Sequence, residues 1–232
     1  MFILNKESMK KCIILTIVSV IACLSAVAQN TIVNNPDNKP YWGLRLGGDI
    51  TCPGDVSAEN VGVSIFKNGG GFEIGGIYNY PLVANLYIEP GLKLYYDTYS
   101  VKDEFMGAFD DEEVSLSGLS FRKFGMRIPV NFGYHFDFTD DVKVSVFTGP
   151  ELEIGFTAKA HLKGDGIDLS ESIYGDDGGM NRVNLLWGIG AGVSYKHFYF
   201  GVNGGIGMLN MLSDSDAKFH ENRVTFSVGY NF

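Results

Sequence analysis

Residues 223–232 read RVTFSVGYNF, and this stretch decides the fold. Bulky apolar side chains occupy every second position from Val224 to Phe232, and the positions between them are polar or glycine. Successive side chains of a β-strand point to opposite faces, so the alternation predicts a strand with one apolar face and one polar face.

The same period of two recurs along the chain. It is regular in segments 85–97, 124–136, 142–156 and 183–195, and less regular near 41–50, 70–80 and 198–209. With the C-terminal segment these make about eight strands, each near the length that a tilted strand needs to cross a bilayer. The connections are short at 80–86, 136–142 and 195–198, and long and polar at 50–70, 97–120, 156–183 and 209–222. We therefore predict an all-β fold, an antiparallel up-and-down barrel.

The apolar face of this barrel is expected to point outward. A soluble barrel such as a lipocalin would show the same period with its apolar face inward. However, an eight-stranded barrel encloses little more than its own inward side chains, and the Phe, Tyr, Leu, Ile and Val of the apolar face are too bulky for that space. The other face is rich in Gly with a minority of charges. We therefore predict a transmembrane barrel of the outer membrane.

Aromatic residues gather near the strand ends, as in the belts at membrane interfaces. The set expected beside the short connections is Tyr78, Tyr80, Tyr134, Phe136, Tyr195, Phe198, Tyr230 and Phe232. The set expected beside the long loops is Tyr96, Tyr99, Phe121, Phe124 and Phe156. With both termini on the periplasmic side, the long loops would lie outside the cell.

The N-terminus has the three parts of a secretory signal. A basic start at residues 9–11 precedes an apolar run at 12–24, which closes on the small-x-small pattern of residues 26–28. We predict a signal peptide over 1–28, with Met9 a candidate start, a flexible leader over 29–40 and the barrel over 41–232. A membrane-anchoring helix and a lipoprotein cleaved before Cys23 stay open as alternatives.

Composition excludes several other classes. The net charge of -9 argues against nucleic acid as a partner. After cleavage Cys52 would be the one remaining thiol, so no internal disulfide is expected, and no Cys/His spacing indicates zinc. We expect neither a metal nor another cofactor.

Strand parity directs a set of charged residues into the barrel: Arg45, Glu73, Glu89, Lys93, Arg127, Glu151, Glu153 and Arg223. Buried charges are costly unless they are paired, so we predict a structural network of ion pairs. The alternative is a polar pathway for ions or small solutes.

No catalytic constellation is evident, and no enzymatic activity is expected. His161 with Ser170 or Ser172 is the one set comparable to the His and Ser of outer-membrane acyltransferases and deacylases. The long loops are acidic, but their spacing matches no calcium loop, so a solvated acidic rim is expected. These acidic residues are Asp103, Glu104, Asp110, Asp111, Glu112 and Glu113, then Asp165, Asp168, Glu171, Asp176 and Asp177.

Two short motifs, Arg127-Ile128-Pro129-Val130-Asn131 and Thr148-Gly149-Pro150-Glu151-Leu152, resemble those of the PorT-family outer-membrane β-barrels of Bacteroidetes. The resemblance covers residues 41–232 and implies a family of barrels. It implies no activity, although the founding member is linked to type IX secretion. The end of the chain at Phe232 is similar to the C-terminal signal read by the barrel-assembly machinery.

The sequence thus predicts an exported outer-membrane barrel that serves as a structural or interaction protein through its long acidic loops. A narrow, porin-like channel is the alternative, and a lipid-modifying enzyme a weaker one. The expected partners are outer-membrane lipid, the assembly machinery and an unidentified extracellular ligand, and a monomer is expected.

Overall fold

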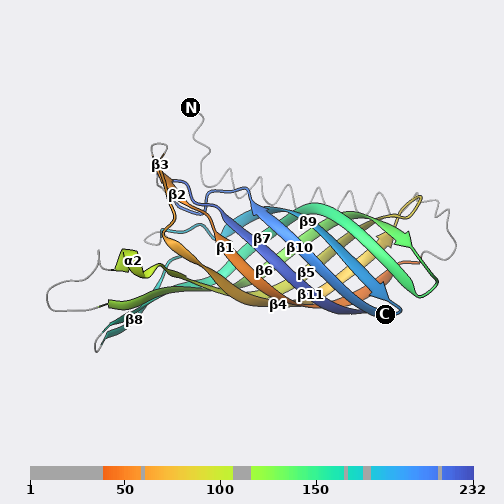
Figure 1. The fold of residues 1–232 in the computed structure, drawn as a ribbon, viewed down its shortest axis with the longest axis horizontal. Coiled ribbons are helices and arrows are strands. Elements are labelled where there is room, and N and C mark those ends of the chain that lie inside the picture. Colours follow the sequence, from red (N-terminus) through yellow and green to blue (C-terminus); the bar gives the residue numbers. More distant parts are fainter. Residues whose placement is uncertain (1–38, 59–60, 107–115, 165–166, 175–178, 214–215) are drawn as a thin grey trace.

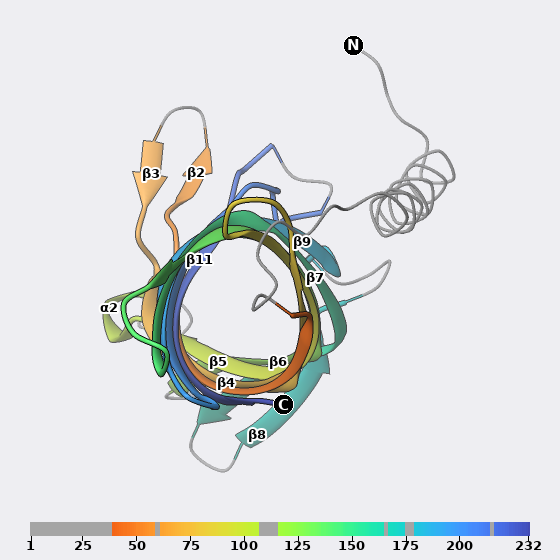
Figure 2. The ribbon, with the colours of Figure 1, turned by 90° about the vertical axis from the view of Figure 1, so that its right-hand side faces the viewer.

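Eight long strands close an antiparallel barrel in the computed structural model, which describes residues 39–58, 61–106, 116–164, 167–174, 179–213 and 216–232 (Figures 1 and 2). Each strand pairs with the next along the chain, and the last pairs with the first. The predicted up-and-down barrel is confirmed. Its strands are β1 (Tyr41–Pro53), β4 (Phe66–Pro81), β5 (Leu86–Val101), β6 (Leu116–Asp137), β7 (Val142–Gly164), β9 (Val183–Tyr195), β10 (Phe198–Gly207) and β11 (Glu221–Asn231).

The predicted signal peptide lies outside the described residues, as does the predicted leader up to residue 38. These two predictions therefore stay predictions. The longest described helix is α2 (Asp103–Met106), and no helix in the described part of the chain is long and apolar enough to cross a membrane.

The two ends of the barrel differ. The turn end carries the short connections, including the two-residue turn of Lys196 and His197, where Lys196 has a φ of 54°. The loop end carries the long connections, which hold the hairpin β2 (Val56–Ala58) and β3 (Val61–Val63) and the strand β8 (Ile167–Ser172). β6 and β7 continue beyond the barrel wall, and β8 pairs with β7 there (Figure 1). The connections expected at 97–120 and 156–183 are shortened accordingly.

The outward face of the wall is apolar along every strand. Large side chains exposed on this face include Leu46, Ile74, Leu94, Phe132, Val146, Ile189, Phe200 and Phe226. On β6 this face runs from Phe124 to Phe136, and twelve residues at about 3.3 Å each, tilted by about 40°, span roughly 30 Å. That length matches the hydrocarbon core of a bilayer.

The inward face is built from charged side chains and from tyrosines that lie on glycines. A Cβ at Gly133 would lie 2.4 Å from the ring of Tyr87, its cross-strand partner, so only glycine fits under that ring. Tyr95 covers Gly125 in the same way. The aromatic assignment at the loop end needs correction, because Tyr99 is buried and Phe121 stacks on it inside the barrel at 5.3 Å. Both lie at inward positions of their strands.

A charge placed on the outward face tests its contact with lipid. Ile189 is 67% exposed near the middle of β9, and Val61 is 65% exposed on the hairpin outside the wall. Ile189→Arg should lower the free energy of unfolding in liposomes by about 2–4 kcal/mol, because the guanidinium would face hydrocarbon. Val61→Arg should change it by less than about 0.5 kcal/mol. Urea titration measures both, and equal small effects would indicate a water-exposed wall.

Candidate functional site: an ion-pair cluster across the barrel interior

Arg127 of β6 is the centre of the barrel interior. Its side chain is fully buried, and it contacts carboxylates from four other strands. Nη1 lies 2.7 Å from Oδ2 of Asp49 on β1 and 2.9 Å from Oε2 of Glu73 on β4. Nε lies 3.0 Å from Oε2 of Glu153 on β7, and Nη2 contacts Asp97 on β5. The planar guanidinium suits this arrangement, since its five N–H groups can each address a different acceptor.

A second arginine extends these contacts to the last strand. Arg223 of β11 places Nη1 3.1 Å from Oε2 of Glu153, and its Nη2 contacts Glu151. Its Nε donates to Oγ1 of Thr225 at 3.2 Å, and that hydroxyl donates to Asp49. The side chains on β1, β7 and β11 are therefore held together inside the barrel.

Two lysines complete the set. Lys93 Nζ lies 2.6 Å from Oε1 of Glu73. Lys123 Nζ lies 3.6 Å from Oε1 of Glu153 and also contacts Glu221. We call the ten residues the interior cluster: Asp49, Glu73, Lys93, Asp97, Lys123, Arg127, Glu151, Glu153, Glu221 and Arg223.

The interior cluster is densely paired and acidic on balance. It holds four cations and six carboxylates, so its formal charge is 4 − 6 = −2 with every group ionised. Buried ions are tolerated when each is paired and hydrogen-bonded, and removing one partner then leaves an uncompensated charge. The cluster can therefore fix the strands relative to one another.

Six of the eight residues that the sequence directs into the lumen lie in the interior cluster. Arg45 and Glu89 do not. The guanidinium of Arg45 lies 4.0 Å from the centroid of the Tyr199 ring, nearer the turn end, and Nη1 donates to the carbonyl of Leu44. Glu89 accepts a hydrogen bond from Nδ2 of Asn79 at 3.0 Å.

Four members of the interior cluster are additional to that set: Asp49, Asp97, Lys123 and Glu221. Asp49 and Asp97 lie at inward positions within the expected segments 41–50 and 85–97, and Lys123 and Glu221 lie one and two residues before theirs with the same inward parity. Extending the period of two by one or two residues adds Lys123 and Glu221, and applying it to every charged residue of the other two segments adds Asp49 and Asp97.

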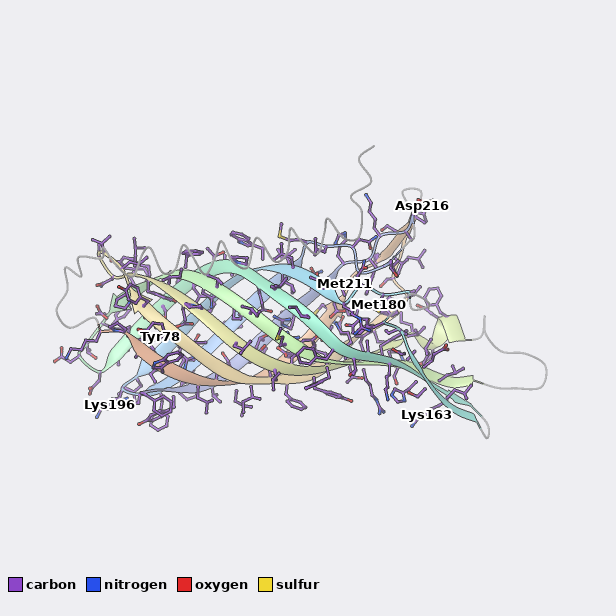
Figure 3. All side chains as sticks on the ribbon, turned by 180° about the vertical axis from the view of Figure 1, so that it is seen from behind. Tyr78, Lys163, Met180, Lys196, Met211 and Asp216 are labelled. Atoms are coloured by element: carbon purple, nitrogen blue, oxygen red, sulfur yellow. The ribbon has the colours of Figure 1, made fainter. Side chains whose placement is uncertain are left out.

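The loop end of the interior is apolar. Ala158, Tyr174, Met180, Met211 and Phe219 form one buried group, which we call the mouth cluster. The segments that carry it are joined by backbone bonds, from Asn181 N–H to Met211 O and from Met211 N–H to Phe219 O, both at 2.8 Å. Figure 3 shows Met180 and Met211 side by side at this end. Burial raises the pKa of the Tyr174 hydroxyl to about 12.

The turn end is open by comparison. A recess of about 870 Å³ lies there, lined among others by Tyr41, Asp137, Lys143, Ser194 and Asn231. Phe232 is exposed beside it, and its N–H donates to the carbonyl of Trp42 at 2.8 Å. Its role as an assembly signal stays a prediction.

The structure brings two residues of the suggested catalytic set close together but does not join them. His161 and Ser170 are cross-strand partners on β7 and β8, but no hydrogen bond joins them among the described residues. Within the same residues, no group of three or more His, Cys, Asp or Glu side chains is arranged to hold a metal ion. Of the acidic loop residues, 110–113, 165 and 176–177 lie outside the described ranges.

Comparison with known proteins finds one matching family and several similar solved structures. A family model described as outer membrane protein beta-barrel domain matches residues 27–213. Similar solved structures include Ail, the attachment invasion locus protein of Yersinia pestis, with 15% identity over 84% of this chain and 100% of that one and a TM-score of 0.42. Neisserial surface protein A matches with 14% identity over the same shares and a TM-score of 0.42.

OprG of Pseudomonas aeruginosa matches with 9% identity over 87% of this chain and 99% of that one, at a TM-score of 0.41. No curated protein matches the sequence.

Removing the central guanidinium tests the interior cluster. Arg127→Met should lower the free energy of unfolding by about 3–5 kcal/mol, because four carboxylates would keep their burial and lose their shared cation. Arg45→Met is the matched control, since Arg45 is equally buried but has no ion pair within the described residues. It should cost about 1–2 kcal/mol, the range of a cation–π contact. Heat-dependent mobility on a gel and urea titration measure both, and equal effects would contradict a central role for Arg127.

Proposed function

Because the chain belongs to the outer membrane β-barrel domain family, and is thus a barrel of the outer membrane, we propose that it acts as a closed interaction barrel. In this proposal the wall and the filled interior form a stable platform in the membrane, and the loop end binds partners outside the cell. The observation that carries this proposal is the interior cluster, in which Arg127 reaches carboxylates of β1, β4, β5 and β7.

The side chains that fill the lumen favour a closed interaction barrel and argue against an open channel. An eight-stranded barrel has room for its own inward side chains and little else. Here that room holds the ten residues of the interior cluster together with Tyr87, Tyr95 and Tyr199. The mouth cluster adds an apolar layer at the loop end, where an entering ion would lose its hydration.

The surface at the loop end supports contact with partners. The extended strands β6 and β7 and the added strand β8 raise a sheet beyond the wall at that end. Leu169 of β8 is 60% exposed there. The wall itself offers no unpaired strand edge, because β11 closes on β1, which supports a monomer whose contacts are made by its loops.

A narrow cation pathway is the second candidate. The recess at the turn end and the excess of two carboxylates in the interior cluster favour it. We propose no enzymatic activity, because we find no catalytic arrangement of side chains among the described residues. The resemblance to PorT barrels, and with it any link to secretion, stays a prediction.

Conductance separates the two candidates. Purified protein, inserted in planar bilayers and checked for a heat-dependent gel shift, should show no discrete openings in potassium chloride, because paired side chains occupy the lumen. Proteoliposomes should likewise exclude small sugars. Reproducible cation-selective steps would favour the pathway and overturn the closed barrel.

Site-specific crosslinking tests the interaction itself. A photoreactive amino acid replaces Leu169 at the loop end or Phe138 at the turn end, which is 69% exposed and so a matched control. On intact cells in their native environment, the Leu169 position should form adducts with external proteins or glycans, and the Phe138 position should form none with these molecules. Absence of external adducts at Leu169 would contradict recognition through the loop end.

A further inference from the structure

The outward face of β6 and β7 changes from aromatic to basic at the loop end. Phe124 and Phe156 pack edge to face there with ring centroids 5.7 Å apart, and both are exposed on the apolar wall. Two residues beyond Phe124, the next outward position of β6 is Arg122, and the corresponding residue of β7 is Lys159. Both are exposed.

These two cations are direct cross-strand partners. Side chains in such a pair have Cβ atoms about 5 Å apart, and like charges placed so are destabilising. No ion pair with a carboxylate accompanies either residue among those the structure describes. Glu171, the acid nearest along β8, pairs with Ala160 and so occupies the opposite face of the sheet. An anion shared by Arg122 and Lys159 would remove their repulsion.

Hydroxyl and imidazole groups surround the pair. Thr98 of β5 lies opposite Arg122, and Ser172 of β8 lies opposite Lys159. Two residues farther along the strands, away from the apolar band, Ser120 lies opposite His161, and both lie on the same face of the sheet as the two cations. The six residues Thr98, Ser120, Arg122, Lys159, His161 and Ser172 form what we call the basic patch. Cationic and hydroxyl donors in one place are suited to the oxygens of a phosphate group.

The depth of the basic patch fits a lipid headgroup. The apolar band on β6 ends at Phe124, and aromatic side chains take the interface level in membrane barrels. Arg122 lies two residues farther along β6, which is about 6.6 Å along the strand and, at a tilt of about 40°, about 5 Å along the membrane normal. Basic side chains just beyond the apolar band meet the phosphate layer of the leaflet, and their stems can lie along the apolar wall.

We propose that the basic patch binds the phosphate group of a phosphorylated lipid in the membrane leaflet at the loop end. Arg122 and Lys159 supply the charge, and His161 and the hydroxyl groups of Thr98 and Ser120 supply further hydrogen bonds, whereas the Ser172 hydroxyl already donates to the carbonyl of Tyr174. This site goes beyond the proposed interaction function, because its ligand lies within the membrane and needs no soluble partner.

Lipid retention measured by native mass spectrometry tests the site. The folded protein in detergent is titrated with lipid A carrying two phosphates, and with the dephosphorylated lipid of the same acyl chains. The wild type should prefer the phosphorylated lipid. R122Q/K159Q should bind it about tenfold more weakly, since each basic group near a phosphate layer contributes several-fold in affinity.

The control variant K67Q/K102Q removes the same charge at the same end. Lys67 and Lys102 are paired with Asp103 at 2.7 Å and with Glu104 at 3.9 Å, so neither is directed to a lipid. This variant should retain wild-type binding. A folded R122Q/K159Q with undiminished binding, or equal wild-type affinity for both lipids, would overturn the proposal.

A competition arm identifies the source of the phosphate. Inorganic phosphate at millimolar concentration should leave the bound lipid in place, and full release would assign the site to a free anion instead. Failure of the proposed function, seen as conductance or as missing adducts at Leu169, would leave the lipid preference unchanged. The two proposals therefore fail separately.

Discussion

The burial of one guanidinium among carboxylates from four strands is the constraint on which the rest of this barrel depends. Arg127 lies inside a barrel whose outward face is apolar, so its guanidinium cannot reach solvent through the wall. Its charge must be met from inside, and the barrel meets it with Asp49, Glu73, Asp97 and Glu153. Three of those carboxylates have a further cation: Lys93 pairs with Glu73, Lys123 and Arg223 pair with Glu153, and Arg223 lies 3.7 Å from Asp49. Among the described residues Asp97 is ion-paired with Arg127 alone.

The glycines and tyrosines of the inward face follow from the same limit on space. Where ten charged side chains share the narrow lumen, a ring fits more easily if the neighbouring strand has a glycine opposite it. Tyr87 over Gly133 and Tyr95 over Gly125 satisfy that condition. Tyr95 also places its ring 4.0 Å from the Arg127 guanidinium, so the aromatic and ionic parts of the interior are one packed unit.

The period of two predicts the fold well, because lipid outside and charge inside impose it on every strand. Its parity places Arg127, Glu153 and Arg223 on the inward face, and all three side chains are buried. The predicted lumen set leaves out Lys123 and Glu221, which lie just before the expected segments. It also leaves out Asp49 and Asp97, although both lie at inward positions within theirs. The prediction that Tyr99 and Phe121 belong to the aromatic belt rests on their nearness to a strand end, although both lie at inward positions of their strands. The mouth cluster could not be predicted, since the paths of the segments around Met180 and Met211 have no period at all.

The closure of β11 on β1 determines how such a chain can fold. The hydroxyl of Thr225 and the carboxylate of Asp49 that meet across this seam are 176 residues apart in sequence, so the contact order of the fold is high. Until the last strand docks, Asp49 faces only part of its partners and Arg223 faces none of them. Partly assembled walls would carry uncompensated ions, so we expect assembly to be cooperative and the docking of the last strand to relieve the remaining unpaired charge.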